Sequence, residues 1–534
     1  DWSSDVCSSD LIRLKYVHSQ RKQSAFMGII IRQSVKGTVV SYVGIAIGFF
    51  TTFFVLTNFL TAEEIGLTRV LVDAATVFAG LAQLGTTSSA IRYYPYFKEG
   101  EKDHGFFFWT LVIPFIGFLI YGIVFWLLKE PISGFFAENS PLFVDYYNFI
   151  FPVGFFLLYM SVFEVNSNLL LRIVVPKFIR EVVVRLLSLA AYLLYAFDLI
   201  NLDGFIIAFS SVYGIATILN IVYIFSLKKI SLKPDFKFLK KSLVKDYLLY
   251  TLFLIAAALG GVIAPSINSF FISAKMGLNF AGIFAIAGYM ASMIEMPYRS
   301  LGTISGPHIS QAIKDQDFTK INALCKSISL HQLLGGFFIF LAIWINIDLI
   351  FELLPNGEIY AAGKWVVFIL GLSRLLNSVF NVSEIVLRYS KFYYVSLILT
   401  VILTTSAIIL NNSLIPVWGM NGAAIASLLS YLIFYFLLLS LVRWKIKTSI
   451  FSWKQAQVVL LVLLLFLCDR LWTSFLTPLF LKLPLKVIYA QVIDAIVKSS
   501  TLLGSGILLT YLWRISEDAN ALIRNILNRF RLRK

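Results

Sequence analysis

The feature that most constrains this chain is a series of apolar runs, each about 20 residues long, separated by short polar stretches. A helix of about 20 residues crosses the hydrocarbon core of a bilayer. Hydrophobic residues make up 59% of the 534 positions and charged residues only 14%, whereas soluble domains average about 45–50% apolar and about 25% charged residues. We therefore expect an all-α, polytopic membrane protein without a soluble domain.

The apolar runs predict about fourteen transmembrane helices. Lys482, Lys486, Asp494 and Lys498 interrupt the last two runs, so a count of twelve or thirteen is the alternative. The expected spans are 37–60, 68–91, 105–128, 143–171, 178–197, 204–226, 246–271, 278–300, 327–352, 364–388, 392–411, 419–441, 455–475 and 488–512.

The positions of the basic residues predict how the chain is oriented in the membrane. With the N-terminus placed inside, thirty-five lysines and arginines fall in inner segments and five fall in outer loops. Cytoplasmic loops of membrane proteins carry such an excess, so both termini are expected in the cytoplasm. The same placement accounts for the net charge of +16, and no nucleic-acid partner is expected.

A weak internal repeat suggests that the chain has two halves. Residues 59–67, after the first expected span, are similar to residues 270–278, after the seventh. Six spans separate the two copies, so both halves have the same orientation, with a pseudo-twofold axis along the membrane normal and a cavity between them. The expected organisation is a six-helix half at 27–227, a basic cytoplasmic linker at 228–245, a second six-helix half at 246–443 and two extra transmembrane helices at 444–513.

The two ends of the chain are expected to lie outside this membrane core. Residues 1–26 contain no apolar segment of the signal-peptide kind and begin with a sequence that resembles a translated sequencing adapter. We expect them to be a non-native or disordered leader, with the biological chain starting at Met27. Residues 514–534 are basic and amphipathic, which predicts a helix that lies on the anionic inner leaflet.

Polar residues follow one face of the tenth expected span. Arg374, Asn377, Asn381, Glu384 and Arg388 are spaced by three or four residues, which places them on the same side of a helix. Ionisable side chains at bilayer depth normally face the interior of the bundle or a water-filled cavity. The stripe is therefore a candidate cavity wall that contacts a polar substrate; hydrogen bonding between helices is the structural alternative.

Other expected spans carry shorter sets of polar residues. Glu295 and Arg299 lie one turn apart and can pair with each other at the cytoplasmic edge. Asn268 is a lone polar residue on the seventh span, for which a structural role is the alternative to a cavity role. The second span contributes Arg69, Asp73, Thr76, Gly80, Gln83 and Thr87, and the fourth contributes Ser161, Glu164, Asn168 and Arg172.

Motifs for cofactor chemistry are missing from the sequence. It contains no Walker loop for ATP, and its four histidines and three cysteines have no metal-binding spacing. No pair of acidic residues marks a glycosyltransferase site near a membrane surface. The sequence therefore predicts no enzyme, no catalytic residue, no metal and no cofactor.

Three segments carry a resemblance to a known family. An outer loop at 60–66 has the form L-x-x-x-E-I-G, a run of small residues extends from Leu84 and Gly85 to Arg92, and the segment 418–431 contains G-x-x-G-A-A-I-A. In these segments the chain resembles the bacterial polysaccharide flippases of the multidrug/oligosaccharidyl-lipid/polysaccharide exporter superfamily. The agreement in topology extends over residues 37–512 and adds Arg92 to the candidate cavity residues.

The resemblance implies a flippase of the bacterial inner membrane that moves an undecaprenyl-diphosphate-linked oligosaccharide, such as an O-antigen, capsule or exopolysaccharide unit, by alternating access of its halves. Its partners would be that substrate, membrane lipids, a polysaccharide polymerase and glycosyltransferases. A lipid II flippase and a drug/cation antiporter of the same superfamily are alternatives. A membrane-embedded polysaccharide polymerase or ligase is an alternative from another class, although such enzymes usually carry a large periplasmic loop that is not found here.

Overall fold

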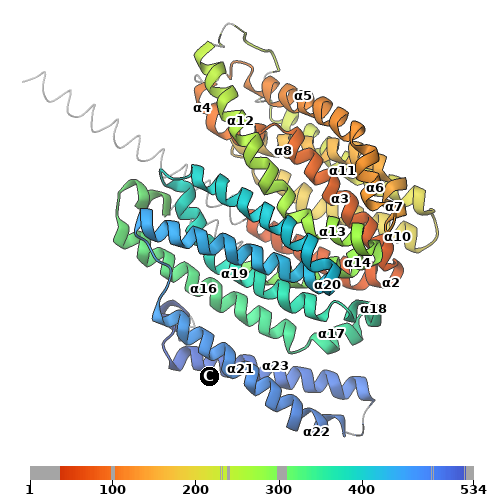
Figure 1. Cartoon of the computed structure of the whole chain (residues 1–534), viewed down its shortest axis with the longest axis vertical. Helices are drawn as coiled ribbons and strands as arrows, with labels where there is room; N and C mark the ends of the chain where they lie inside the picture. Colours follow the sequence, from red (N-terminus) through yellow and green to blue (C-terminus); the bar gives the residue numbers. More distant parts are fainter. Residues whose placement is uncertain are drawn as a thin grey trace, which may run out of the picture. The chain divides into compact units, whose positions relative to one another are not determined.

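All regular elements in the described part of the chain are helices, as the apolar runs predict. The computed structural model describes residues 36–97, 103–228, 230, 232–236, 238, 241–297, 309–482, 484, 486–521 and 524. The expected leader at 1–26 and most of the expected tail lie outside these residues. Figure 1 traces the described helices from the N-terminal end of the chain, in red, to the C-terminal end, in blue.

Eleven helices among the described residues are long and apolar enough to cross a membrane. The stretch Tyr394–Ile446 contains two of the expected spans, and its backbone breaks at Gly419, where φ is +54°. The expected spans at 178–197 and 246–271 are also helical, although neither is among the eleven. Each of the fourteen expected ranges is therefore mainly helical over the residues described, although some contain a turn, such as 83–85 within the second range.

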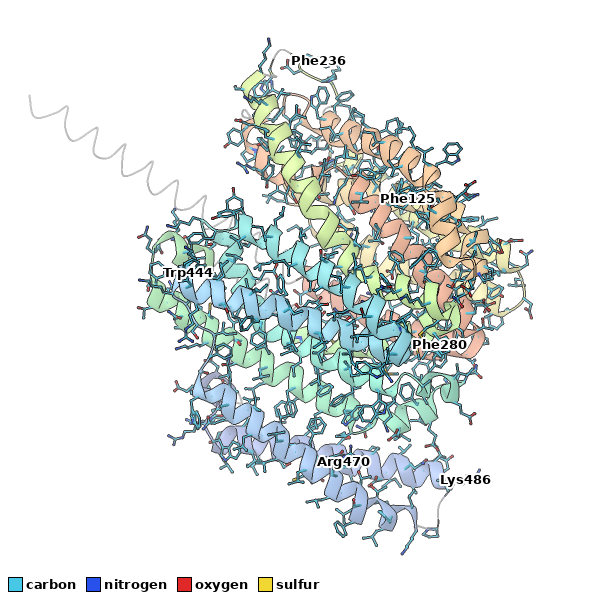
Figure 2. The ribbon with its side chains drawn as sticks, in the orientation of Figure 1. Phe125, Phe236, Phe280, Trp444, Arg470 and Lys486 are labelled. Atoms are coloured by element: carbon cyan, nitrogen blue, oxygen red, sulfur yellow. The ribbon has the colours of Figure 1, made fainter. Side chains whose placement is uncertain are left out.

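One compact unit comprises the described residues within 36–51, 78–126 and 151–255. Phe78 is fully buried, and its ring packs edge-on against the rings of Phe118, Phe125 and Phe151 at centroid distances of 5.6, 5.1 and 5.9 Å. Phe125 is labelled on α5 in Figure 2. The unit contains the end of α3 (Ala62–Ala82), α4 (Thr86–Phe97), α5 (Phe106–Leu127), α8 (Ile150–Leu169), α9 (Val174–Phe178), η3 (Ile179–Val183), α10 (Val184–Ala196), α11 (Leu202–Ser226) and most of α12 (Lys241–Ile263).

The break between α3 and α4 explains the family-like Leu84-Gly85 pair. Both residues have positive φ, at 49° and 66°. Glycine adopts this conformation without strain, and a Cβ on Gly85 would also lie only 2.7 Å from the Cβ of Leu254. The motif therefore interrupts one long apolar run and places α4, which carries Arg92, at a new angle.

The second unit comprises 52–77, 127–150 and the described residues within 256–534. Within it, α19 packs against α14, α16 and α20, and α21 packs against α23 and α16 (Figure 1). Its further helices are η1 (Thr51–Leu56), α2 (Thr57–Phe59), the start of α3, α6 (Lys129–Phe136), α7 (Pro141–Asp145), η2 (Tyr147–Phe149), η4 (Ala264–Ser266), α13 (Ile267–Met276), α14 (Leu278–Ser292), η5 (Met293–Glu295), α16 (Phe318–Trp344), α17 (Ile347–Leu353), α18 (Gly357–Ala361), α19 (Lys364–Tyr389), α20 (Tyr394–Leu441), η6 (Val442–Ile446), α21 (Trp453–Phe475), α22 (Thr477–Leu481) and α23 (Val487–Leu512).

Two glycines in the second unit let α3 and α14 approach closely. A Cβ on Gly66 would collide with the backbone carbonyl of Leu278, and a Cβ on Gly282 would collide with the carbonyl of Ala62. Small residues at a crossing point allow backbones of membrane helices to meet in this way. Gly66 belongs to the family-like loop motif, so this motif also has a packing role.

The start of the C-terminal tail packs on the protein. Ile515 is fully buried in the cluster formed by α16, α21 and α23, and the Ser516 hydroxyl lies 2.9 Å from Nε2 of His331. The side-chain amide of Asn520 donates a 3.0 Å hydrogen bond to the carbonyl of Tyr511. The membrane-surface helix expected for the rest of the tail stays a prediction, as do the expected boundaries between the two halves and the linker.

Candidate functional site

The polar stripe of the tenth span lies on one uninterrupted helix, α19. Its buried face is otherwise made of apolar and small residues, including Val366, Gly371, Ser378 and Val382. This pattern holds α19 between α16 and α20 and turns the stripe toward neighbouring helices. Figure 1 shows α19 between these two helices.

Arg374 is paired with a carboxylate from another helix. Its guanidinium lies 3.4 Å from Oε1 of Glu295, which ends the short 3-10 turn η5. The side-chain amide of Asn377, one turn further along α19, donates a 2.8 Å hydrogen bond to the same oxygen. The Tyr435 hydroxyl on α20 donates a 2.5 Å hydrogen bond to Oδ1 of Asn377. Glu295, Arg374, Asn377 and Tyr435 therefore form one polar network across three elements.

The two charges of this network differ in exposure. The Glu295 side chain is 8% exposed, whereas that of Arg374 is 35% exposed. The carboxylate is therefore more enclosed than the arginine, part of whose side chain stays accessible. A charge at this depth is unfavourable against lipid and normally faces the protein interior or a water-filled cavity, so the open part is suited to meeting an anion there.

The C-terminal end of the stripe forms a second group. Arg388 lies 2.6 Å from Oε1 of Glu384, and Asn381 donates a 3.2 Å hydrogen bond to Oε2 of the same carboxylate. Arg388 is 62% exposed. All five residues of the stripe are thus linked into two acid-centred groups along one helix.

Arg69 and Asp73 pair with each other on α3. Nε of Arg69 donates a 3.0 Å hydrogen bond to Oδ2 of Asp73, and the two side chains are 50% and 9% exposed. Further along the sequence, Oγ1 of Thr87 donates a 2.8 Å hydrogen bond to the side-chain oxygen of Gln83. Both contacts join residues four apart in sequence, which are neighbours on a helical surface.

Glu164 on α8 pairs with Arg180 on η3 at 2.8 Å. Asn168, one turn after Glu164, has a buried side-chain oxygen without a hydrogen-bond partner among the described residues. On α4, the guanidinium of Arg92 lies 4.2 Å from the ring centroid of Tyr250 on α12, a cation–π distance. These contacts are in the first unit.

Asn268 has a structural environment. Its amide donates a 2.6 Å hydrogen bond to Ser427, and its side-chain oxygen accepts a 3.0 Å hydrogen bond from Asn411. Both partners are on α20, which packs against α13. This bonding between helices corresponds to the structural alternative.

The sequence did not identify four residues that complete these groups: Tyr435, Arg180, Tyr250 and Asn411. Arg180 lies at the start of an expected span and has no polar neighbour in a helical pattern with Glu164, and a tyrosine in an apolar run gives no signal of its own. Tyr431 and Tyr435, four residues apart, share a face of α20 and have stacked rings, and this spacing was the available signal. Arg299 lies outside the described residues. No group of three or more metal-ligating side chains is found in the described part of the chain.

Comparison with known proteins gives a family and a fold. A family described as polysaccharide biosynthesis protein matches residues 32–313. No curated protein matches the chain. The chain is similar in structure to a lipid II flippase MurJ in an inward closed conformation, with a TM-score of 0.65, 12% identity and coverage of 88% of this chain and 99% of that one.

Two further solved structures have the same fold. An inward-facing multidrug resistance MATE family transporter of the MOP superfamily gives a TM-score of 0.57 at 14% identity, covering 77% of this chain and 96% of that one. A MOP superfamily transporter from Pyrococcus furiosus gives 0.51 at 14% identity, covering 77% and 94%. At these identities the likeness establishes the fold alone.

Proposed function

Because the chain belongs to the polysaccharide biosynthesis protein family, we propose that it is a flippase for an undecaprenyl-diphosphate-linked oligosaccharide. It is a multi-pass membrane protein with the fold of flippases and transporters. The cargo would be an O-antigen, capsule or exopolysaccharide unit that crosses the bacterial inner membrane. The glycosyltransferases that build this unit and the polymerase that consumes it would be its functional partners.

The observation that carries this proposal is the half-open Arg374. A diphosphate is anionic, and a guanidinium binds phosphate oxygens with two parallel hydrogen bonds. Glu295 and Asn377 fix the arginine from behind, and 35% of its side chain stays accessible. A charge-assisted contact of this kind contributes about 1.5–3 kcal/mol.

Glu295 and the diphosphate of the substrate would compete for the guanidinium of Arg374. The arginine cannot form its best geometry with Glu295 and with a diphosphate at the same time, so binding would weaken the pair. Asn377 and Tyr435 would then hold the carboxylate side of the network in place. An arginine that changes partners can bind the headgroup and later release it, which a translocation cycle requires.

The remaining candidate residues keep secondary roles in this proposal. Arg388 with Glu384 extends the polar surface toward the inner end of α19. Arg69, Asp73, Gln83, Arg92, Glu164, Asn168, Asn381 and Arg299 stay predicted cavity residues, and Asn268 is assigned to helix packing.

The deciding experiment is translocation by the purified full chain in proteoliposomes. Three cargoes are compared: an undecaprenyl-diphosphate-linked oligosaccharide, lipid II and a cationic dye. Transfer of the oligosaccharide carrier, but not of the dye, is the expected result. Faster transfer of lipid II would favour the lipid II flippase, and transfer of the dye alone would favour the antiporter.

The proposed orientation, with both termini cytoplasmic, has its own test. Single cysteines at Lys228 and Glu138, introduced where the native cysteines have been replaced, are exposed to an impermeant thiol reagent in intact cells. Glu138 is expected to react and Lys228 is not, because the loop after α11 is rich in lysine. The reverse pattern would invert the topology.

A further inference from the structure

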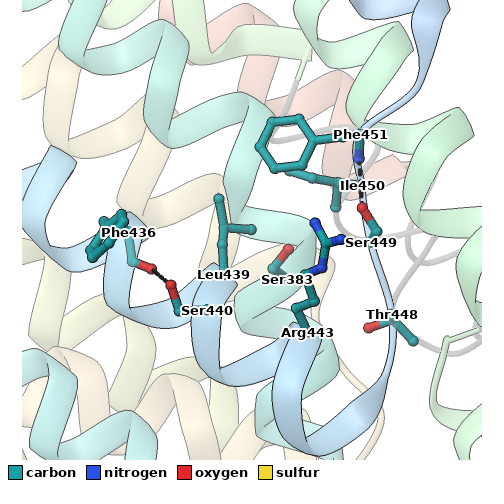
Figure 3. A pocket seen from close by; sticks show the side chains of 9 residues that line it. All are labelled: Ser383, Phe436, Leu439, Ser440, Arg443, Thr448, Ser449, Ile450 and Phe451. Carbon is teal, nitrogen blue, oxygen red and sulfur yellow. Dashed lines mark hydrogen bonds between the residues drawn. The ribbon is translucent and has the colours of Figure 1, made fainter.

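A cavity lies where the chain turns back after the long helix α20. It has a volume of about 240 Å³ and is lined by the last turns of α20, Arg443 of η6, the following residues 448–451 and one serine of α19, Ser383 (Figure 3). This volume is below the range of about 300–1,000 Å³ for drug-sized ligands and suits a small headgroup.

The sequence builds this cavity by ending α20 irregularly. The helix continues as a π-helical turn at Val442–Ile446, and Lys447 then takes a left-handed φ of 58°. Ile446 and Ile450 are buried in the apolar cluster shared with α19 and α20, and the backbone N–H of Ser449 donates a 2.8 Å hydrogen bond to Asn322. The wall that faces α20 is therefore fixed at both ends.

Arg443 supplies a charge without a carboxylate partner. Its guanidinium extends from η6 toward Ser383 and Ser449 (Figure 3), and it makes no ion pair or hydrogen bond with the described residues. Arg374, by contrast, forms an ion pair with the carboxylate of Glu295. Arg443 is thus available to an external anion.

Thr448 supplies a second unsatisfied polar group. The residue is 3% exposed, and its buried hydroxyl has no hydrogen-bond partner among the described residues. An unpaired buried hydroxyl lowers stability unless a ligand or water completes it. Thr448 lines the same cavity as Arg443.

The apolar side of the cavity and its surroundings place it at a membrane surface. Phe436 and Phe451 line the cavity and are 72% and 57% exposed. Trp444 and Trp453 flank it and are 71% and 79% exposed, and Trp444 is labelled in Figure 2. Tryptophans gather at the headgroup level of bilayers, and the neighbouring basic residues predict the inner leaflet.

We propose that this cavity binds the phosphate of an anionic phospholipid headgroup from the cytoplasmic leaflet. Arg443 would bind the phosphate oxygens, Thr448 would donate a hydrogen bond, and the lipid chains would pass over Phe436 and Phe451. This lipid would hold the turn between α20 and α21. The assignment depends on the cavity alone and is independent of the proposed cargo.

The test is lipid binding to the delipidated full chain in detergent, followed by native mass spectrometry. The probes are phosphatidylglycerol, phosphatidylcholine and inorganic phosphate. Phosphatidylglycerol is expected to bind most tightly. Its affinity should fall about tenfold in Arg443→Gln and about threefold in Thr448→Val, and Arg443→Lys should be intermediate because lysine lacks the planar fork.

Arg514→Gln is the matched control, because it removes an exposed basic residue on the predicted inner side but outside the cavity. It should leave affinity unchanged. An equal loss of phosphatidylglycerol affinity in the control would show that only general charge attraction is involved, and it would contradict the proposed site. Equal affinity for phosphatidylcholine would contradict it as well. Displacement of the lipid by equimolar inorganic phosphate would assign the cavity to a soluble anion instead. If Arg443→Gln does not fold, unchanged binding in Thr448→Val and Arg443→Lys would be sufficient to reject the proposal.

Discussion

Two of the pairs of opposite charge inside predicted membrane spans of the second unit differ in how far their charges are exposed. Arg374 and Glu295 are 3.4 Å apart and 35% and 8% exposed. Lys498 on α23 and Asp469 on α21 are 3.5 Å apart, and both are 11% exposed. The distances are alike, but the first pair leaves its cation open and the second is closed on both sides.

The surroundings of the two pairs extend this difference. Close to the closed pair in sequence, Asp494 accepts hydrogen bonds from the Trp472 indole at 2.8 Å and from the Thr477 hydroxyl at 2.9 Å. These contacts join α21, α22 and α23 to one another. The open pair instead belongs to a stripe that continues along α19 to Arg388. A charge inside a span is therefore insufficient evidence for a substrate site, and the exposure of its cation separates the two cases.

The largest expected effect is on the closed pair. Lys498→Ala leaves the Asp469 carboxylate buried and unpaired, which should lower the free energy of unfolding by about 3–5 kcal/mol. The melting temperature of the purified protein in detergent should fall clearly, whereas transport per folded molecule should stay at the wild-type level.

Two further variants sharpen this result. The double variant Asp469→Leu and Lys498→Met removes both charges and should regain most of the lost stability. Arg470→Gln is the control on the same helix, because Arg470 is exposed (labelled in Figure 2), and it should change the melting temperature little. A wild-type melting temperature in Lys498→Ala would show that the pair does not stabilise the fold.

Substitution of Arg374 in the open pair should lower the rate of translocation. Arg374→Ala removes the diphosphate contact and should slow translocation about tenfold or more. Arg374→Lys should rescue it only partly, because an ammonium cannot bind two oxygens in parallel. The measurement is the initial rate of translocation in proteoliposomes, normalised to folded protein.

A double variant separates binding from stability at this pair. Arg374→Ala alone also leaves Glu295 unpaired, so it should lower the melting temperature; adding Glu295→Gln removes the stranded charge and should restore it. Translocation should stay slow, because Arg374 is still missing. Recovery of translocation in the double variant would make the pair a structural element like Asp469 and Lys498. Lys364→Ala, at the N-terminal end of the same helix, is the control for changes of charge on α19.

The sequence predicted the features that are determined by residues within a single helix. Membrane spans follow from the length of apolar runs, and the α19 stripe follows from a spacing of three and four residues. It also predicted the bend region of α20 as a boundary between two spans, and Gly419 is where the backbone departs from helix. Each of these features is local in the sequence.

Contacts between different helices could not be predicted from the sequence in the same way. Lys498 and Asp494 made the last two spans uncertain, since an isolated charge disfavours insertion. The structure resolves this difficulty, because each charge has a partner on a neighbouring segment. Likewise, the spacing offered Glu295 only Arg299, which lies outside the described residues, and it gave no sign of the partners Arg374 and Asn377 on α19. Such pairings depend on how the helices pack, which a single sequence does not specify.

The smallest expected effect is at Arg388, the C-terminal end of the stripe. Arg388 is 62% exposed and pairs with Glu384 one turn earlier on the same helix, and exposed pairs of this kind stabilise a helix by only about 0.3–0.5 kcal/mol. Arg388→Ala should therefore leave the melting temperature nearly unchanged. If the whole stripe contacts the substrate, translocation should still slow by about twofold to threefold, corresponding to a weak, water-exposed contact.

The salt dependence of translocation distinguishes the contact at Arg388 from that at Arg374, because salt screens an exposed contact more strongly than a less exposed one. The difference between Arg388→Ala and wild type should disappear at high ionic strength, whereas the Arg374→Ala defect should persist. A loss at Arg388 as large as that at Arg374, and equally resistant to salt, would move the main substrate contact to the C-terminal end of α19.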